Sequence, residues 1–402
     1  MKKILYPLLI ILALCSCSNT NDSSISNHTN KEKPITGIDP IFNEELGYYN
    51  MSPSALKISD SEMYVYYTRN ENIYTENSDS IAVRHATLVD NKWNYSDFKT
   101  ILRLPNDENA WDSKYISSPD VIKGIFSYNG KTYNYLMAYA GSIVSGRMNS
   151  QIGFAVSNYP DGEFIRVGNE PIISYDSSSH SASGLKRYKG VQEPSLVSYN
   201  KKGKIQLFYS YYATYNASYC VEMDCSNLNS IIKGGAMVNQ ISGLFDETTN
   251  THLYSADWAY DPVNDEYIVC RNYSSSTTGQ PSVASAVQLV YAKSKAFSEV
   301  NYEYDQDKVE PVWNLVNQKY SKIGAIKTAD EYSDNEMKWS GYYRVYNGCV
   351  ISNAYGWLDN TNKIEILFTS NALDNSKYLK DDEYKYSSMI HYYAVDFIKE
   401  EI

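Results

Sequence analysis

Hydrophobic and polar residues alternate along most of the chain with a period of two residues. The alternation is clearest in five runs, which read MYVYYTR, YNYLMAYAG, KIQLFYSYY, EYIVCRN and KIEILFTS. A period of two predicts β-strands, and turn sequences such as YNGK, NKKGK and PVNDE separate them. Because no long amphipathic helix and no regular strand–helix alternation appears, the pattern predicts an all-β fold rather than a doubly wound parallel sheet.

The strand pattern also repeats over a longer interval. Each unit has a turn containing proline or aspartate, a strand, a Gly/Asn/Asp turn and an aromatic strand, and units begin about 70 residues apart. Radial repetition of four-stranded sheets protects strand edges, so we predict a five-bladed β-propeller over residues 35–402. A pair of β-sandwiches is the structural alternative, but it does not explain five similar units. The units begin near Asn50, Ser117, Val191, Ser255 and Trp339.

The segment before the repeats has a different character. Two lysines precede the apolar run ILYPLLIILAL, which is too short to span a membrane as a mature helix and is typical of an export signal. The following LCSC resembles a bacterial lipobox, in which Cys17 fits as the lipidated residue better than Cys15 because a small serine precedes it. We expect a lipoprotein signal peptide over residues 1–17 and a flexible tether over residues 18–34. An ordinary secretory signal is the alternative.

This N-terminal segment and the charge of the chain limit the partners. We expect an exported monomer, anchored by lipid to the bacterial envelope on its periplasmic or outer surface and meeting the membrane only through that anchor. The formal net charge is −11 and no long basic cluster occurs, so we expect no nucleic-acid partner. Tyrosine is frequent, at 40 of 402 residues, and its ring either packs between strands or stacks on sugars.

Four cysteines follow the N-terminal segment. Export permits disulfides, but the spacing assigns no pair, and CVEMDC lacks the second Cys or His pair that a metal site would need. We expect buried thiols, with one disulfide as the alternative. The four residues are Cys220, Cys225, Cys270 and Cys349.

Acidic or polar residues stand where the innermost strands of the predicted blades begin. In a propeller such positions converge on one axial pocket although they are far apart in sequence. Hydrolysis of a glycosidic bond needs an acid that protonates the leaving oxygen, and inverting enzymes add a carboxylate that activates water. A third carboxylate nearby raises the pKa of the acid. A lone Asp or Glu is more often a turn residue, so the repeat context selects this set: Asp39, Ser52, Asp120, Glu193 and Asp257.

The first three units resemble glycoside hydrolase family 43 and its five-bladed relatives. The resemblance runs from Gly37 to Tyr212, and its segments are GIDPIFNEELGYYNMSPSALKI, ISSPDVIKGIFSYNGKTYNYLMAYA, IGFAVSNYPDGEFI and GVQEPSLVSYNKKGKIQLFYS. The third segment is the most specific. The resemblance implies that Glu193 is the general acid and that Asp120 orients it and modulates its pKa. The family usually has Glu-Gly-Pro or Glu-Ala-Pro where this chain has Glu-Pro.

Ser52 occupies the position at which the family carries its general base, in Asp-Pro-Ser. A serine hydroxyl has too high a pKa to act as a general base near neutral pH. Three explanations stay open. The chain is a relative that binds sugar without hydrolysing it, or Asp39, Asp257 or Asp261 supplies the base, or the alignment is shifted, against which the preserved SPSAL spacing argues.

Further residues are candidates for ligand contacts. We expect Trp258, Asp257 and Arg344 to contact the substrate, while packing between blades and a structural salt bridge are the ordinary alternatives for the tryptophan and the arginine. Members of the family often carry a channel histidine, sometimes beside calcium. We assign no metal and expect no cofactor, with a structural calcium as the open alternative. The histidines after the signal and tether match no such motif; the candidates are His85, His180, His252 and His391.

The resemblance implies a glycoside hydrolase that acts on arabinofuranosyl or xylosyl linkages of an oligo- or polysaccharide. A non-catalytic surface glycan-binding protein is the alternative that Ser52 favours. A propeller that binds a protein partner is a third hypothesis.

Overall fold

The computed structural model describes residues 40–41, 47–73, 75, 79–175, 189–212, 216–239, 255–273, 284, 286–294, 314–316, 322–323, 342–372 and 388–398. These residues belong to one compact unit, Glu32–Ile402, and their regular elements are all strands. In this described part of the chain, no helix has the length and apolar character needed to span a membrane. The expected signal peptide, Cys17 and the tether lie outside the described residues.

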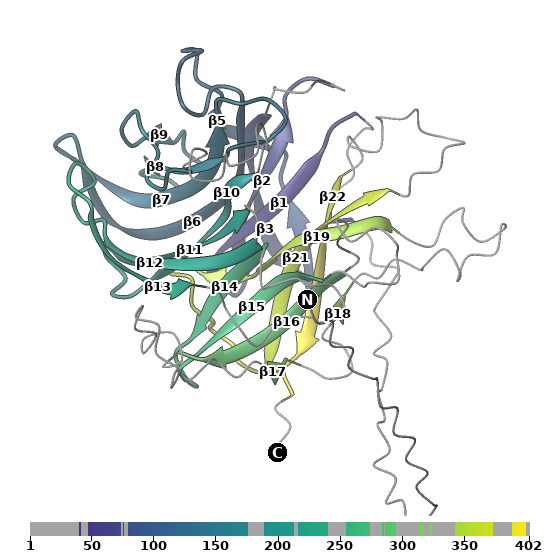
Figure 1. The fold of residues 1–402 in the computed structure, drawn as a ribbon. Helices are drawn as coiled ribbons and strands as arrows, with labels where there is room; N and C mark the ends of the chain where they lie inside the picture. Colours follow the sequence, from purple (N-terminus) through teal and green to yellow (C-terminus); the bar gives the residue numbers. More distant parts are fainter. Residues whose placement is uncertain are drawn as a thin grey trace, which may run out of the picture. The chain divides into compact units, whose positions relative to one another are not determined.

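Five antiparallel sheets follow one another along the chain, and each corresponds to one predicted unit (Figure 1). Sheet 1 contains β1 (Asn50–Ser59), β2 (Glu62–Asn70), β3 (Asp79–Val89), β4 (Lys92–Tyr95) and β5 (Lys99–Arg103). Sheet 2 contains β6 (Tyr115–Tyr128), β7 (Lys131–Ser142), β8 (Gln151–Ser157) and β9 (Ile165–Arg166). Sheet 3 contains β10 (Gly190–Ser198), β11 (Lys204–Tyr212), β12 (Asn216–Asp224) and β13 (Ile232–Asn239).

The last two sheets complete the set. Sheet 4 contains β14 (Ala256–Asp261), β15 (Glu266–Tyr273), β16 (Ala286–Lys293), β17 (Asn314–Leu315) and β18 (Lys322–Ile323). Sheet 5 contains β19 (Tyr342–Val350), β21 (Lys363–Ala372) and β22 (Met389–Asp396), while the short β20 (Ser352–Asn353) pairs with β1 of sheet 1.

The first strands of the sheets contact one another in cyclic order. β1 contacts β6, β6 contacts β10, β10 contacts β14, β14 contacts β19, and β19 returns to β1. Near the start of the chain, Pro40 pairs with His391 of β22, and the Ile41 N–H donates to the Ile390 carbonyl at 2.9 Å. The beginning of the domain therefore adds to the final sheet, and the predicted five-bladed β-propeller is confirmed.

The hydrophobic core is divided among the five interfaces between neighbouring blades. Each interface holds one apolar cluster, as where Leu56 and Tyr66 of blade 1 meet Val121 and Met137 of blade 2. Strands buried on both faces explain why aromatic side chains are so frequent, since large rings fill the wedge between adjoining blades. The largest side chains with under 2% exposure include Tyr66, Tyr67, Tyr139, Phe126, Phe154, Phe208 and Phe368.

A segment after β19 crosses the far end of the innermost strands. We call residues 352–358 the strap. The strap pairs with β1 at Leu56. Leu56 lies four residues after Ser52, which is about 13 Å along the strand at the usual rise per residue. The contacts of the strap link blade 5 to every other blade, so it ties the ring together on the side away from the strand starts. The bonds to blades 2, 3 and 4 run from Lys123 N–H to Ala354 O at 2.6 Å, Ser198 N–H to Tyr355 O at 2.9 Å, and Tyr260 N–H to Gly356 O at 2.9 Å.

Gly356 lets the strap lie against blade 3, and a variant pair tests this contact. Both Gly356 and Gly130 have a φ of 75°, but an added Cβ at Gly356 would lie 2.5 Å from the Leu196 carbonyl, whereas nothing lies within 4 Å at Gly130. We expect Gly130→Ala to cost about 1 kcal/mol and Gly356→Ala at least about 2 kcal/mol in the free energy of unfolding, measured in denaturant. Equal losses would show that the strap does not depend on close packing.

Candidate active site

The innermost strands bend at a common point. In β1, β6, β10 and β19 the pairing with the next strand is interrupted by a β-bulge. At that point, and just before β14, one residue per blade has a left-handed backbone. A non-glycine residue in this conformation costs about 1–2 kcal/mol, and such strain gathers at functional sites. These five bulge residues, with φ in parentheses, are Ser52 (52°), Ser118 (48°), Glu193 (54°), Ser255 (48°) and Asn347 (46°).

Side chains of the preceding blade hold the bulges in place. Each acceptor side chain lies on the second strand of one blade. It accepts a hydrogen bond from the backbone N–H of the bulge residue in the next blade. In blade 2 the equivalent position is Ala140, whose side chain has no acceptor atom. The Glu193 N–H therefore has no such bond to blade 2. The four bonds run from Ser52 to Thr369 Oγ1 at 3.0 Å, Ser118 to Thr68 Oγ1 at 2.9 Å, Ser255 to Ser210 Oγ at 2.8 Å, and Asn347 to Asn272 Oδ1 at 2.7 Å.

The residues two positions after the bulges link the blades a second time. The Leu196 N–H donates to Asp120 Oδ2 at 2.5 Å, and the Val350 N–H donates to Asp257 Oδ2 at 2.7 Å. Between these blades, the Trp258 N–H donates to Ser195 Oγ at 3.0 Å. We call this set the ring residues. They are Ser54, Asp120, Ser195, Asp257 and Cys349.

The bulge residues surround one cavity. Its empty volume is about 350 Å³, with the open space at its mouth included. As expected from the repeat, the cavity brings together Ser52, Asp120, Glu193 and Asp257 from four blades. Besides the five bulge residues, its lining contains Pro53, Ser54, Pro119, Asp120, Pro194, Ala256, Asp257 and Gly348.

Glu193 is held by two hydroxyl groups. Tyr212 Oη donates to Glu193 Oε2 at 2.5 Å, and Ser255 Oγ donates to Oε1 at 3.0 Å. The Tyr212 and Ser255 hydroxyls also contact each other. Since both oxygens accept hydrogen bonds, the Glu193 side chain has a fixed orientation in the cavity.

Asp120 and Asp257 form an electrostatically coupled pair. Burial raises the pKa of Asp120 to about 6, against the opposing effect of hydrogen bonds from Ser54 and two backbone N–H groups. Burial raises the pKa of Asp257 to about 8, and the negative charge of Asp120 adds to this increase. The charge of Asp120 therefore raises the pKa of Asp257. Burial thus favours the protonated form of Asp257 more strongly than that of Asp120.

Ser52 has an amide partner. Asn347 Nδ2 donates to Ser52 Oγ at 2.7 Å, so the two bulge residues of blades 1 and 5 are joined across the cavity wall. Ser52 occupies the same structural position in blade 1 as Glu193 does in blade 3. No carboxylate stands at Ser52, and among the described lining residues the acids are Asp120, Glu193 and Asp257.

The structure corrects one expected substrate contact. Trp258 is 2% exposed and stacks on Phe208, with ring centroids 4.3 Å apart, between blades 3 and 4. Its side chain therefore packs in the core and does not line the cavity. Asp261 is also excluded as a replacement base, since it lies at the opposite end of β14 and accepts bonds from the turn residues Val263 and Asn264.

Two further candidate site residues, Asp39 and Arg344, cannot be placed at the cavity, and the cysteines are free thiols. Asp39 lies outside the described residues. The backbone of Arg344 pairs with Asn371 in β19, but its side chain is outside the described part of the structure. All four cysteines of the domain are buried free thiols, and the alternative of one disulfide is not observed among them.

The two described histidines, His85 and His391, do not line the cavity. His391 is buried against Ser370, with Nε2 2.6 Å from Oγ, and His85 lies 3.0 Å from Glu62. His180 and His252 are outside the described residues. Among the residues that the structure does describe, no group of three or more His, Cys, Asp or Glu side chains is placed to hold a metal ion.

Sequence reasoning missed Tyr212, Ser255 and Asn347 as site residues. Ser255 was detectable, because SAD at residues 255–257 matches SPD at residues 118–120 with alanine in place of proline. Asn347 had no such signal, since Gly348 replaces the proline there. Tyr212 was one of many tyrosines at a strand end, and only the folded register places it beside Glu193.

The shifted pKa of Asp257 predicts a pH-dependent stability. The folded chain keeps a proton on Asp257 that the unfolded chain releases, so this group lowers the free energy of unfolding as pH rises from about 4 to about 8. Asp257→Asn should exceed the parent in stability at pH 8 by at least about 1 kcal/mol, and by less at pH 5. Denaturant titrations at both pH values measure this, with the exposed Asp97→Asn as the control. A pH-independent difference would contradict the assignment.

Comparisons with known proteins bear on the fold. No protein-family model and no curated protein matches the sequence. The fold is similar to that of a family 117 glycoside hydrolase from the marine bacterium Zobellia galactanivorans, at 13% identity over 91% of this chain and 90% of that one, with a TM-score of 0.51. It is also similar to a GH62 hydrolase solved with xylotriose, at 10% identity over 88% and 94% of the two chains, with a TM-score of 0.51. The chain thus has the five-bladed propeller fold found in glycoside hydrolases, and the predicted family 43-like propeller is confirmed as a fold.

Proposed function

We propose that this protein is a glycoside hydrolase-like protein whose axial cavity receives one sugar residue of a polysaccharide. The observation that carries the proposal is the convergence of Asp120, Glu193 and Asp257 in a cavity otherwise lined by small residues. An arabinofuranosyl or xylosyl residue is the proposed sugar, which the sequence resemblance supports together with the likeness to a hydrolase solved with xylotriose. Export and lipid attachment at Cys17 belong to the same proposal, because polysaccharides are met outside the cell.

In this proposal Glu193 is the general acid. Tyr212 and Ser255 fix its carboxyl group, which protonates the glycosidic oxygen as the bond to the anomeric carbon breaks. The ionised carboxylate of Asp120 stabilises the positive charge that develops on the sugar ring. Asp257 is the candidate base for the attacking water, and because burial raises its pKa, its ionised form should increase as the pH rises above neutral.

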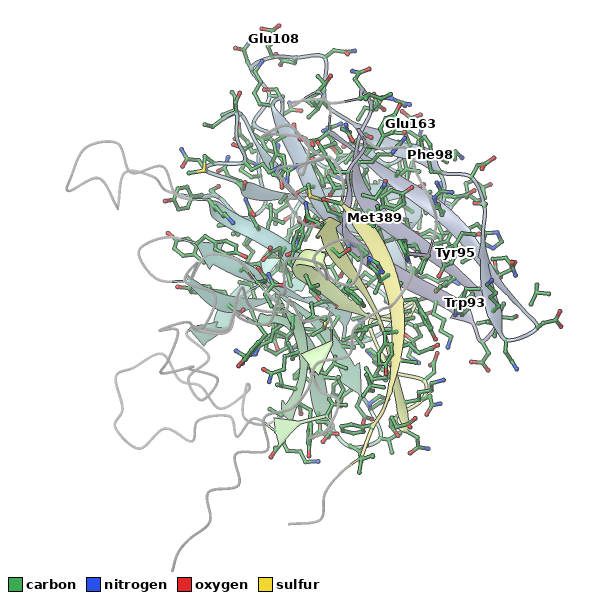
Figure 2. The ribbon with its side chains drawn as sticks, turned by 90° about the vertical axis from the view of Figure 1, so that its right-hand side faces the viewer. Trp93, Tyr95, Phe98, Glu108, Glu163 and Met389 are labelled. Carbon is green, nitrogen blue, oxygen red and sulfur yellow. The ribbon has the colours of Figure 1, made fainter. Side chains whose placement is uncertain are left out.

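Glu193→Gln tests the role of the acid. We expect at least a roughly 100-fold loss of kcat on arabinofuranosyl or xylosyl oligosaccharides, because their leaving oxygen needs a proton. The loss should be much smaller on dinitrophenyl glycosides, whose leaving group needs none. The matched control is Glu163→Gln, at an exposed residue on the molecular surface (Figure 2). Equal rates for Glu193→Gln and parent on the oligosaccharides would exclude Glu193 as the acid.

A second candidate function is binding of a glycan without hydrolysis. The bond from Asn347 to Ser52 favours it, because an amide–hydroxyl pair stands where an inverting hydrolase would carry its base. In this case Glu193, Asp120 and Asp257 act as hydrogen-bonding groups for sugar hydroxyls.

Ser52→Asp distinguishes the two functions. If the unaltered chain only binds glycans, calorimetry should detect binding, turnover should be absent, and the new carboxylate should create measurable hydrolysis. Ser118→Asp, which places a carboxylate at the bulge of blade 2 instead, is the matched control and should create none. Rapid turnover by the unaltered protein would remove the binding-only function.

A further inference from the structure

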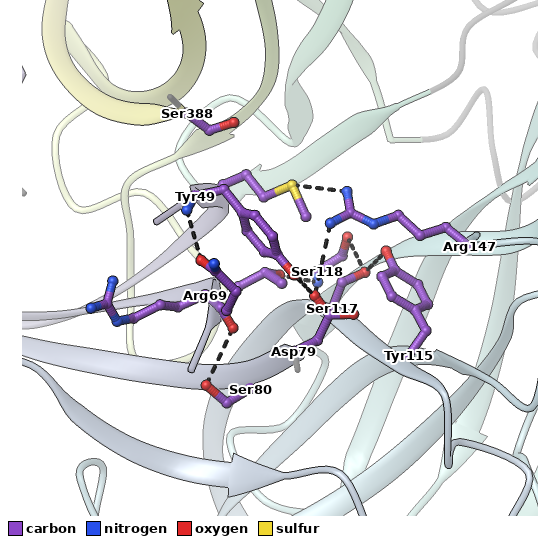
Figure 3. Close-up of polar contacts among 12 residues, drawn as sticks. Tyr49, Arg69, Asp79, Ser80, Tyr115, Ser117, Ser118, Arg147 and Ser388 are labelled. Atoms are coloured by element: carbon purple, nitrogen blue, oxygen red, sulfur yellow. Dashed lines mark hydrogen bonds and ion pairs between the residues drawn. The ribbon is translucent and has the colours of Figure 1, made fainter. Parts of the chain in front are cut away.

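A second pocket lies at the opposite end of the innermost strands from the axial cavity. The axial cavity lies where these strands begin, beside groups such as Ser118, whose Oγ is 3.2 Å from Ser117 Oγ (Figure 3). The second pocket lies where β10 ends at Ser198 and where the strap crosses. Ser198 is five residues after Glu193, about 16 Å along the strand. We call this second cavity the strap pocket, and its empty volume is about 890 Å³ with the open space at its mouth included.

The strap pocket lies between blades 3 and 4. Val197, Gln206 and Glu222 are paired across β10, β11 and β12, so their side chains form one row on one face of blade 3. Tyr260 and Tyr267 are paired across β14 and β15 and form a similar row on blade 4. All five residues line the pocket, so the two rows face each other across it.

Hydrogen bonds within the protein hold the wall of the pocket in place. The Tyr267 hydroxyl donates to Gln206 Oε1, and Gln206 Nε2 donates to Tyr199 Oη at 3.0 Å. Trp357 of the strap donates through Nε1 to the Ser198 carbonyl at 2.7 Å. These bonds join blade 3 to blade 4 and to the strap, so the pocket has a defined shape in the folded chain.

The carboxyl group of Glu222 has no such partner. Among the residues that the structure describes, none forms a hydrogen bond or an ion pair with it. The side chain is half-buried, and burial raises its pKa. Burial also raises the pKa of Tyr267, and the charge of Glu222 adds to this increase, so the carboxyl group lies near that ring. A partly buried carboxylate without a partner in the protein gains from a ligand that donates hydrogen bonds.

Two partly exposed tyrosine rings supply apolar surface beside this carboxyl group. Tyr199 is 42% exposed, and Tyr260 is half-buried. The Tyr260 hydroxyl donates to Asp265 Oδ1 at 2.9 Å, and its ring stands at 73° to that of Trp357. One face of a sugar ring carries C–H groups that pack on an aromatic ring, while hydroxyls at its edge donate hydrogen bonds. Aromatic rings beside a carboxylate therefore fit a sugar.

The charges at the strap pocket favour an uncharged ligand. Glu222 is the one charged residue among the described residues of its lining, and it would repel an anion. Lys201 lies beside the pocket, with Nζ 4.4 Å from the ring centroid of Trp357, and it would repel a cation.

We propose that the strap pocket is a second glycan-binding site, which takes one neutral sugar residue of a polysaccharide. The Glu222 carboxylate accepts hydrogen bonds from two neighbouring hydroxyls, and the ring of Tyr260 or Tyr199 packs on the C–H face of the sugar. Because the two sites lie at opposite ends of the innermost strands, they bind different segments of the polymer. The inference rests on the proposed function only in taking a polysaccharide as the ligand.

Affinity electrophoresis in gels that contain arabinoxylan or arabinan tests this proposal. We expect at least one of these neutral polymers to retard the parent, and Glu222→Ala to bind it about ten-fold more weakly. Tyr260→Leu, which keeps an apolar side chain without the flat ring, should show a similar loss, and Glu222→Gln, which keeps an acceptor oxygen, a smaller one. The matched controls Glu163→Ala and Tyr159→Leu, at exposed residues, should bind like the parent.

Several outcomes would overturn the proposal. One is equal retardation of Glu222→Ala and the parent, and another is a parent that neither neutral polymer retards. Retardation by cationic chitosan or anionic polygalacturonate in place of the neutral polymers would overturn the assignment to a neutral sugar. If Tyr260→Leu fails to fold, the comparison of Glu222→Ala with Glu222→Gln decides.

Hydrolysis of an aryl arabinofuranoside or aryl xyloside separates this inference from the proposed function, because such a small substrate occupies only the axial cavity. Glu222→Ala should leave its rate unchanged. If Glu222→Ala keeps its affinity for the polymer while Glu193→Gln loses hydrolysis of oligosaccharides, only the strap pocket is removed. If the parent shows no turnover but Glu222→Ala still loses affinity for the polymer, only the catalytic role is removed.

Discussion

The left-handed bulge at the start of each innermost strand is the constraint on which the site depends. It interrupts the strand pairing in four blades, and one left-handed residue in every blade lines the cavity and strains the backbone. Such strain persists only where neighbouring structure holds it, and here side chains of the preceding blade cap four of the five bulges. The cavity is therefore a property of the closed ring rather than of any one blade.

The bulge residues and the ring residues have different roles. The bulge residues give the cavity its chemistry, with Glu193 in blade 3 and Ser52 joined to Asn347. The ring residues join neighbouring blades, and two of them are carboxyl groups with raised pKa values. Beyond both sets, the strap connects all five blades at the far end of the strands. The same contacts thus stabilise the propeller and hold its carboxyl groups in place.

The fold was predictable from the sequence because one pattern repeats five times, whereas the site was predictable only in part. Ser52, Asp120 and Glu193 were found because a proline marks each bulge, but in blades 4 and 5 Ala256 and Gly348 replace it. Trp258 looked like a sugar-stacking residue, and only the packing between blades shows that Phe208 covers it. Tyr212 carried no sequence signal, because only the folded register places its hydroxyl beside Glu193.

We propose that the bulge residues form a sugar-binding pocket on the propeller axis. The most direct measurement is a crystal structure of the Glu193→Gln variant soaked with a xylosyl or arabinofuranosyl oligosaccharide. We expect one terminal sugar ring in the cavity, within hydrogen-bond distance of residue 193 and of Ser52 or Asn347. An empty axial cavity, with ordered sugar bound elsewhere on the surface, would contradict it.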